Sequence, residues 1–214
     1  MKSLKIGEKL GRIIRRIIPY RIYRDYIPYI RYIRWKQQPY NAKSFFESYW
    51  KATEGFEDRC TISPQKSELH ARFHYNLVEN NIIEFLVDHN YNVADLDVLD
   101  IGSGTGHWLR FWEDLSANSV TGIEISETAF KKLQRKFKGH ENIRIILGDI
   151  SSDTFHLDRK FDVINAIGVM FHVVDDKLWE KAIKNLCNYL KGGNRIRWRR
   201  LWSSNSKCSI SHDR

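Results

Sequence analysis

Short apolar runs alternate along the centre of the chain with longer segments in which apolar residues recur every three or four positions. The short runs predict buried β-strands, and the longer periodic segments predict helices. The predicted strands are 98–101, 120–125, 143–147 and 161–167. The predicted helices between or after them are 107–117, 126–138 and 175–190. Because strands alternate with helices, we expect an α/β fold with a mostly parallel sheet and helices on both of its faces.

A long helix is predicted upstream of the sheet, over residues 68–90. Its apolar residues approximate a stripe with the period of a helix, and they are Leu69, Phe73, Leu77, Ile82, Ile83, Leu86 and Val87. We therefore interpret residues 37–94 as a helical N-terminal cap and residues 95–193 as the main domain. His70 and His74 share one face of this helix, but no third ligand is apparent, so we expect a packing or surface role and no metal site.

Positive charge is concentrated at the two ends of the chain. Residues 1–36 hold eleven Lys and Arg against two Asp and Glu, and residues 192–214 hold six against one. The region between them has more acidic than basic residues. The net charge of +9 therefore describes the ends and says little about chemistry in the centre.

Residues 1–36 form a basic arm rich in Ile, Tyr and Arg, in which Pro19 and Pro28 argue against one continuous helix. We keep three hypotheses for this arm: packing on the main domain, a helix lying on a membrane surface, and contact with a nucleic acid. Charge alone does not distinguish these partners.

The sequence predicts neither a membrane span nor a disulfide framework. Charged residues interrupt every apolar stretch before it reaches the roughly 18 residues of a membrane span, and the three cysteines are widely spaced. We therefore expect a cytoplasmic protein, with peripheral attachment to a membrane through the arm as an alternative.

A glycine-rich turn follows the first predicted strand. It reads Asp100, Ile, Gly102, Ser103, Gly104, Thr, Gly106, and a helix is predicted to begin directly after it. Glycines permit a sharp turn and let a ligand approach the backbone closely. In open parallel sheets, ligands bind at such turns, outside the carboxyl ends of the strands. An ordinary tight turn between strand and helix is the alternative.

Acidic residues also end the next two predicted strands. Glu124 ends the second, where a carboxylate accepts hydrogen bonds from both hydroxyls of a ribose. Asp149 follows the third, where its carboxylate would accept from an exocyclic amine and the N–H of Ile150 would donate to a ring nitrogen. Because the carboxyl ends of parallel strands meet at one edge, the three acids predict a nucleoside site there.

The glycine spacing favours a nucleoside without phosphate. The run is G-x-G-x-G and not the dinucleotide fingerprint G-x-G-x-x-G, and Asp100 would repel a pyrophosphate at the start of the helix. The same acid suits a ligand with a cationic amino group, such as S-adenosylmethionine. A nicotinamide-dependent oxidoreductase is disfavoured for the same reason.

Together these motifs resemble the cofactor motifs of class I, Rossmann-like S-adenosylmethionine-dependent methyltransferases. Residues 161–172 are similar to that family's fourth motif, and residues 190–193 to the glycine turn after its next helix. The resemblance implies that Gly102, Gly104 and Gly106 line the methionine moiety, and that Asn165 runs past the reactive sulfonium. It assigns Glu124 to the ribose and Asp149 with Ile150 to the adenine. The implied activity is methyl transfer to an O, N, C or S nucleophile of an unidentified acceptor.

His172 is the candidate general base, needed only when the acceptor must lose a proton. It follows the fourth predicted strand, and an imidazole titrates near neutrality. A packing or substrate-shaping role is the alternative. His107 and Trp108, beside the glycine turn, are expected to pack the helix start and shape the cofactor site.

The end of the sequence departs from the family pattern. No run after Gly193 reads as a buried central strand, and residues 194–214 form a basic and polar tail in which Trp and Arg alternate. We expect the final strands of the fold to be missing or divergent, through truncation or a shifted reading frame. Two further alternatives follow: a catalytically inactive relic that binds the cofactor, or a membrane- or RNA-docking module with a degenerate fold.

Overall fold

The computed structural model describes residues 40–53, 55–62 and 67–192 of the chain. The hypotheses for the basic arm and for the tail after Gly193 lie outside the described residues. The chain divides into the units Met1–Asn41 and Ala42–Arg214, and the elements described below belong to the second.

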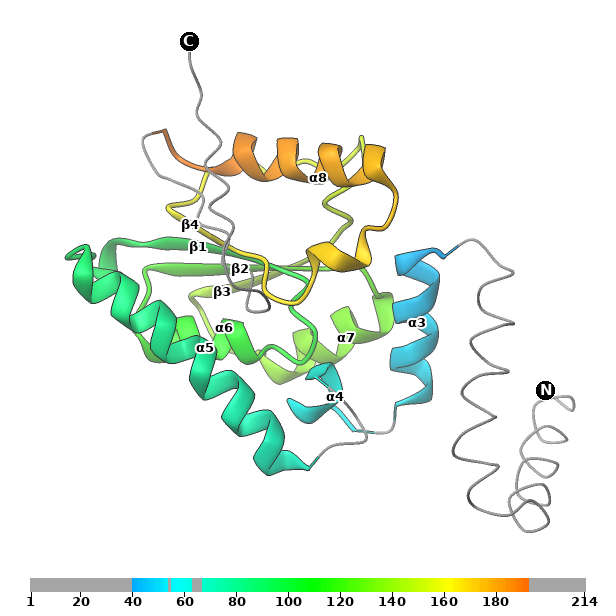
Figure 1. Ribbon diagram of the computed structural model, residues 1–214, viewed down its shortest axis with the longest axis horizontal. Helices are drawn as coiled ribbons and strands as arrows, with labels where there is room; N and C mark the ends of the chain where they lie inside the picture. The colour runs from blue at the N-terminus through cyan, green and yellow to red at the C-terminus, as the bar shows by residue number, and fades with distance from the viewer. Residues whose placement is uncertain (1–39, 54, 63–66, 193–214) are drawn as a thin grey trace, which may run out of the picture. The chain divides into compact units, whose positions relative to one another are not determined.

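Four parallel strands form the sheet, in the spatial order β3-β2-β1-β4 (Figure 1). Their bounds are β1 (Asp97–Ile101), β2 (Ser119–Glu124), β3 (Ile143–Leu147) and β4 (Val163–Asn165). Val98 of β1 pairs with Val120 of β2 on one side and with Val163 of β4 on the other. All five residues of β1 are buried, as expected for a central strand covered on both faces.

Helices cover both faces of this sheet (Figure 1). The helices after the strands are α6 (His107–Asp114), α7 (Glu127–Lys136) and α8 (Asp176–Tyr189). On one face, Trp108, Leu109 and Trp112 of α6 pack with Val98 and Val120. On the other, Ala182 and Leu186 of α8 pack with Leu99, Ile101 and Ile123. Alternate residues of one strand thus point into two cores, and the predicted α/β, Rossmann-like fold is confirmed.

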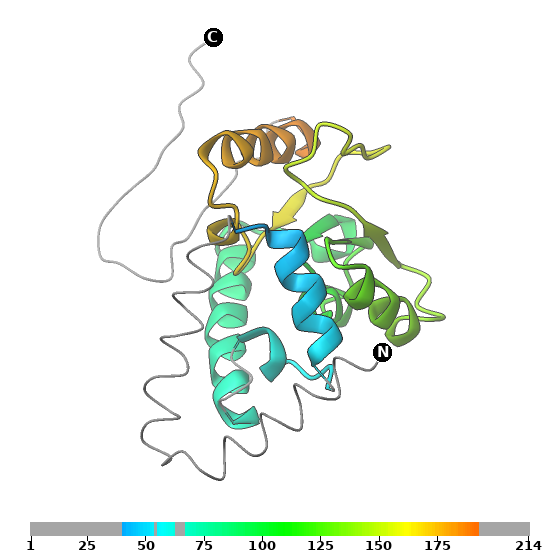
Figure 2. The same cartoon turned by 90° about the vertical axis from the view of Figure 1, so that its right-hand side faces the viewer.

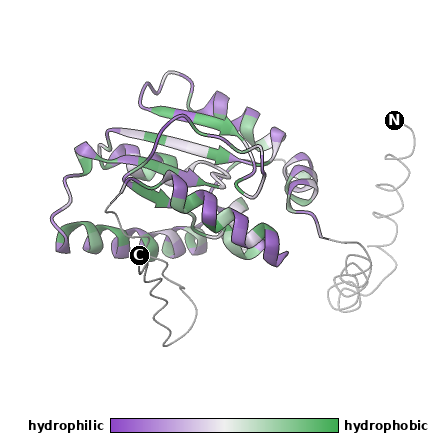
Figure 3. Cartoon of the chain, turned by 90° about the horizontal axis from the view of Figure 1, so that it is seen from above, coloured by the Kyte–Doolittle hydropathy of each residue, from purple (hydrophilic) through white to green (hydrophobic). Residues whose placement is uncertain are grey.

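Hydropathy follows this layered arrangement. Figure 3 shows hydrophobic residues in the strands, interrupted by stretches of intermediate and hydrophilic residues, whereas hydrophobic and hydrophilic residues alternate around the helices. Ser126 and Asp175 begin α7 and α8 by accepting backbone N–H groups of the first turn, those of Ala129 and Leu178. The predicted fourth strand is longer than β4, because after Asn165 the chain turns into the short helix η2 (Met170–His172).

The cap ahead of the sheet consists of α3 (Ala42–Ala52), α4 (Arg59–Ile62) and α5 (Glu68–Asp88). Helix α5 confirms the long helix predicted at 68–90. The predicted stripe meets the core at Ile82 and Leu86, but it is wrong about the face of the first half of the helix. The buried residues are Ala71, Tyr75, Val78 and Leu86, whereas Leu69, Phe73 and Leu77 are exposed. Ala71, Tyr75 and Val78 lie one turn apart on their own face, and Tyr75 and Val78 pack with α6 and the sheet.

The chain after α8 returns to the sheet beside β4. Leu190 forms an isolated parallel bridge with Phe161, and the N–H of Lys191 donates to the carbonyl of Phe161. The Lys191 ammonium lies 2.9 Å from a carboxylate oxygen of Asp97 and 2.6 Å from one of Asp162. These contacts fix the end of α8 on the side of β4 away from β1, where the description ends at residue 192.

Candidate functional site

The glycine turn joins β1 to α6 in a conformation that requires glycine. Gly102, Gly104 and Gly106 have φ angles of +71°, +54° and +84°, which L side chains rarely adopt. The N–H groups of Gly102 and Ser103 both donate to the carbonyl of Ile123, so the turn is fastened to β2. A Cβ atom on Gly102 would lie 2.5 Å from Cγ2 of Val169, so the segment after β4 packs directly on the turn.

Asp100 is fully buried beneath this turn. Its Oδ1 accepts a hydrogen bond of 2.7 Å from the side-chain amide of Asn165, at the end of β4. Its Oδ2 is buried and has no hydrogen-bond partner. Burial raises the pKa of Asp100 to about 7, against the opposite effect of the hydrogen bond from Asn165. A buried carboxylate oxygen without a partner is costly, and it fits a cationic amino group as its missing partner.

Glu124 lies at the end of β2 and is 3% exposed. Its two carboxylate oxygens accept 2.9 Å hydrogen bonds from the N–H groups of Gly104 and Ser126. Burial raises the pKa of Glu124, although these backbone hydrogen bonds act in the opposite direction. The structure therefore brings Glu124, the residue predicted to bind the ribose, together with the glycine turn and Asp100 at one edge of the sheet.

Asp149 and Ile150 follow β3 at the same edge. Oδ1 of Asp149 accepts hydrogen bonds from the N–H and the hydroxyl of Ser151, at 2.8 and 2.6 Å. Ile150 is buried, and its carbonyl accepts a hydrogen bond of 2.7 Å from the Asn185 amide of α8. These contacts hold the turn after β3 in place, and they do not link it directly to Asp100 or Glu124.

His172 ends the helix η2, on the opposite side of the glycine turn from Asp149. Its ring meets the ring of Phe46 edge-on, with 4.8 Å between centroids, and lies 4.2 Å from the ring of Phe171. Burial lowers the pKa of His172 below its ordinary value. Sequence reasoning did not identify Phe46 as a neighbour, because 126 positions separate the two residues and no periodicity relates them.

Of the cap helices, α3 and α4 lie at the carboxyl ends of the strands, on the side that faces the viewer in Figure 2, whereas α5 packs along the face of the sheet that α6 covers. Glu47 of α3 accepts hydrogen bonds from the hydroxyls of Ser126 and Thr128, both at 2.7 Å, and from the N–H of Thr128. These hydrogen bonds, with that from the Thr128 hydroxyl as the main cause, lower the pKa of Glu47 to about 2. A Cβ atom on Gly104 would lie 2.7 Å from Cγ2 of Thr61 in α4, so the cap also touches the glycine turn.

His107 has a larger structural role than the helix-start packing expected from the sequence. Its Nδ1 lies 2.6 Å from a carboxylate oxygen of Asp58, and its Nε2 lies 2.7 Å from one of Glu79. The ring stacks on Tyr75 with 3.5 Å between centroids. Asp58 also accepts from the Thr105 hydroxyl at 2.9 Å. Burial acts to raise the pKa of Asp58, but the hydrogen bonds from His107 and Thr105 hold it below its ordinary value.

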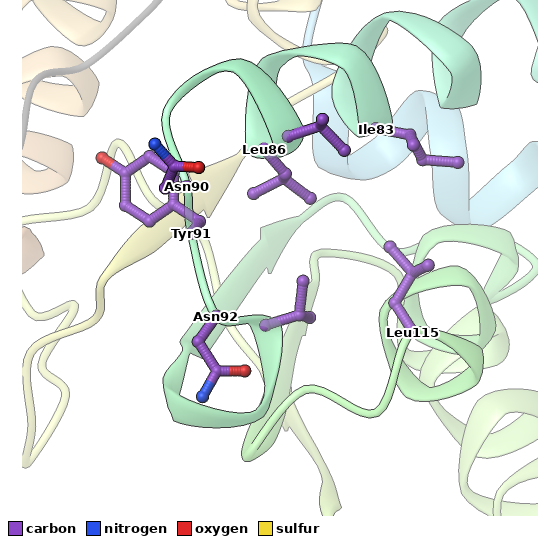
Figure 4. Close-up of a pocket in the computed structure, with 8 residues that line it drawn as sticks. Ile83, Leu86, Asn90, Tyr91, Asn92 and Leu115 are labelled. Atoms are coloured by element: carbon purple, nitrogen blue, oxygen red, sulfur yellow. The ribbon is translucent and has the colours of Figure 1, made fainter.

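A separate open hollow lies at the other end of the sheet (Figure 4). Its lining is mostly apolar and comes from the end of α5, the segment before β1 and Leu115. Because β1 begins after this segment, the hollow lies beside the amino ends of the strands and away from the glycine turn. Among the polar residues that line the hollow, Asn92 donates a hydrogen bond of 2.8 Å from its side-chain amide to the carboxylate of Asp95.

Within residues 40–53, 55–62 and 67–192, no group of three His, Cys, Asp or Glu side chains is arranged to hold a metal ion. No helix in this described part combines the length and the apolar composition needed to cross a membrane.

A protein-family profile described as "Methyltransferase domain" matches residues 98–193. Among solved structures, magnesium protoporphyrin IX methyltransferase from Synechocystis, with S-adenosylhomocysteine bound, is 20% identical, with a TM-score of 0.53; the match covers 70% of this chain and 68% of that one. The N-methyltransferase NodS from Bradyrhizobium japonicum, also solved with S-adenosylhomocysteine, is 20% identical, with a TM-score of 0.52; the match covers 72% of this chain and 70% of that one. Both likenesses concern the fold.

A further similar structure is an S-adenosylmethionine-dependent methyltransferase from Clostridium acetobutylicum, which is 26% identical with a TM-score of 0.48. The match covers 54% of this chain and 46% of that one, so the chain spans about half the length of this relative. A search of curated proteins finds no match.

Proposed function

We propose that residues 98–193, which match the methyltransferase-domain profile, form a class I, S-adenosylmethionine-dependent methyltransferase domain, and that the protein binds S-adenosylmethionine and methylates an acceptor. The observation that carries the proposal is the buried carboxylate of Asp100, with one oxygen lacking a partner directly beneath the glycine turn. A site built for phosphate would place positive charge or free N–H groups there.

The cofactor supplies an electrophilic methyl group, and the residues of the chain bind and orient it. In our proposal the free oxygen of Asp100 holds the amino group of the methionine moiety, while Gly102, Ser103, Gly104 and Gly106 lie against that moiety. Asn165 keeps the Asp100 carboxylate in place through its 2.7 Å hydrogen bond.

Residues at the end of β2 and after β3 bind the nucleoside half of the cofactor in this proposal. Glu124 accepts hydrogen bonds from the ribose hydroxyls, and Asp149 with the N–H of Ile150 holds the adenine. In the structure Glu124 is bonded to Gly104 and Ser126, and Thr61 of α4 covers Gly104. In our proposal the cap shifts as the cofactor binds, and the remaining lone pairs of the Glu124 carboxylate accept from the ribose hydroxyls.

His172 is the proposed base for acceptors that must lose a proton. It lies on η2, after the strand whose end carries Asn165, and burial lowers its pKa, so its imidazole is neutral and ready to accept a proton at pH 7. We also propose that the protein works in the cytoplasm. Contact of residues 1–36 with a membrane surface or a nucleic acid remains a separate proposal, based on their charge alone.

Equilibrium dialysis with radiolabelled S-adenosylmethionine tests the proposal through Glu124. Glu124→Gln keeps the size of the side chain but replaces one accepting carboxylate oxygen with a donating NH2 group, so we expect affinity to fall at least about tenfold. Glu113→Gln is the matched control, since Glu113 of α6 is a half-buried carboxylate that forms a hydrogen bond with His140. Equal affinity of the Glu124→Gln variant and the unaltered chain would remove Glu124 from the site, and no binding by the folded, unaltered chain would refute the function.

A further inference from the structure

Rings from two distant parts of the chain meet beside the proposed cofactor site. Phe46 of α3 lies edge-on to His172 of η2, Phe45 lies 5.2 Å from Phe46, and Phe171 lies 4.2 Å from His172, all between ring centroids. We name Phe45, Phe46, Phe171 and His172 the aromatic rim. The rim is continuous, although its two halves come from the cap and from the segment after β4.

The rim adjoins the position from which a methyl group would be delivered. Asn165 ends β4 and is bonded to Asp100, and Val169, four residues later, contacts the glycine turn at Gly102. The rim residues of η2 follow directly after Val169 and Met170. A molecule lying on the rim is therefore next to the proposed methionine end of the cofactor, which is where an acceptor must lie.

The rim exposes much of its apolar surface. Phe171 is 71% exposed and Phe45 is 42% exposed. In the first turn of α8, Leu178 and Trp179 are each 43% exposed. Exposed apolar groups beside a binding site are a usual sign of an apolar ligand, and aromatic side chains bind flat rings by stacking and edge contacts.

The chemistry of the rim excludes a strongly charged occupant. Three of its residues are phenylalanines, and burial lowers the pKa of the fourth, His172, so that its imidazole is neutral at pH 7. A neutral imidazole nitrogen accepts a hydrogen bond from a hydroxyl group. A phosphate or a carboxylate would be desolvated against the phenyl rings without a cation among the rim residues to balance it.

We propose that the aromatic rim binds the methyl acceptor, and that the acceptor is a neutral aromatic compound bearing a hydroxyl group. This inference rests on the proposed function and deepens it, because it adds the chemical class of the acceptor. The flat ring lies against Phe46 and Phe171, and the hydroxyl faces His172.

A binding experiment with 2-naphthol as the probe tests the rim. The fluorescence of 2-naphthol is followed on titration with the full chain, with and without S-adenosylhomocysteine, and phenyl phosphate is added as a competitor. We expect the unaltered chain to bind 2-naphthol, and equimolar phenyl phosphate not to displace it. Phe171→Ala should bind 2-naphthol about tenfold more weakly, and Phe171→Leu should recover the affinity for 2-naphthol. Phe73→Ala is the matched control, because Phe73 on α5 is 66% exposed, and it should bind 2-naphthol like the unaltered chain.

The outcomes separate the rim from the cofactor site. Absence of 2-naphthol binding, equal weakening by Phe73→Ala, or stronger binding of phenyl phosphate would overturn the acceptor class. If 2-naphthol binds at the rim but S-adenosylhomocysteine does not bind the same preparation, the proposed function fails and the acceptor role fails with it. Binding of both, with the affinity for S-adenosylhomocysteine unchanged in Phe171→Ala, supports the two proposals separately.

Discussion

At the scale of single residues, Asp100 combines complete burial with an oxygen that has no hydrogen-bond partner. Its pKa is raised by burial to about 7, above the ordinary value of 3.8. The folded protein therefore holds a proton that the unfolded chain has released between these two pH values. The contribution of Asp100 to stability falls as pH rises from about 4 to about 7 and then levels off.

We predict that Asp100→Asn becomes progressively more stable than the unaltered protein as pH rises from 5 to 8. Asparagine fills the same space without a charge to bury, and the gain between these pH values is about 2 kcal/mol in the free energy of unfolding. Urea unfolding at both pH values measures it. Asp114→Asn, at an exposed position on α6, should follow the unaltered protein. A constant difference between Asp100→Asn and the unaltered protein would show that Asp100 does not titrate in this range.

The glycine turn provides a second prediction at this scale. Gly102→Ala places a side chain at φ +71° and 2.5 Å from Val169, whereas Gly168→Ala meets the same conformational cost at φ +74° with no atom within 4 Å. We expect a loss of about 1–3 kcal/mol for Gly168→Ala and a larger loss for Gly102→Ala, both measured by urea unfolding. Equal losses would mean that the segment after β4 does not pack on the turn.

The site residues differ in how far the sequence predicts them. Asp100, Glu124 and Asn165 could be placed at one edge, because each ends a strand of a parallel sheet and such ends meet. The hydrogen bond between Glu124 and Gly104 could not be predicted, since it depends on the exact path of the turn. The contacts of His107 with Asp58 and Glu79 could not be predicted either, because they depend on how the cap docks.

At the scale of elements, the carboxylate of Glu47 and the ammonium of Lys132 fasten α3 to α7. Glu47 accepts three hydrogen bonds from Ser126 and Thr128, and Lys132 donates to the carbonyls of Trp50 and Thr53 at 3.3 and 3.1 Å. Trp50 packs with Ala129 in the apolar contact between the same helices. If the cap shifts when the cofactor binds, as we propose, these polar contacts contribute to the free energy of that motion.

We predict that Glu47→Gln loosens α3 without unfolding the sheet. The substitution weakens charge-assisted hydrogen bonds at a side chain that is 24% exposed, so the local cost is on the order of 1 kcal/mol. Hydrogen exchange should become about fivefold faster in the amides of α3 and stay unchanged in β1. Glu127→Gln, at an exposed ion pair within α7, should leave exchange in α3 unaltered. Equal protection of α3 in both variants would contradict the role of Glu47.

Helix α5 shows why periodicity predicts an element better than it predicts a face. Apolar residues occur on more than one side of this helix, so a stripe through Leu69, Phe73 and Leu77 fits the helical period as well as one through Tyr75 and Val78. The core selects the second, where the Tyr75 ring stacks on His107. That choice depends on the tertiary contact with α6, and the sequence of α5 alone does not contain it.

At the scale of the whole molecule, the alternation of strands and helices was sufficient to predict the parallel sheet with two covered faces. Helices on both faces explain why all of β1 and nearly all of β2 are buried, and parallel pairing collects the functional residues at one edge. The position of the cap over that edge was not predictable, because it depends on contacts between segments far apart in the sequence. The cofactor edge and the aromatic rim thus belong to one side of the sheet.

The most direct test of the account is calorimetric titration of the full chain with S-adenosylhomocysteine, with NAD as the control. Asp100 must be ionised to pair with the ligand's ammonium group, so affinity should rise with pH through about 7. We predict micromolar binding of S-adenosylhomocysteine at pH 8, none of NAD, and affinity reduced at least about tenfold in Asp100→Asn. Unchanged affinity in a folded Asp100→Asn variant, or preferential binding of NAD, would contradict a cofactor site centred on Asp100.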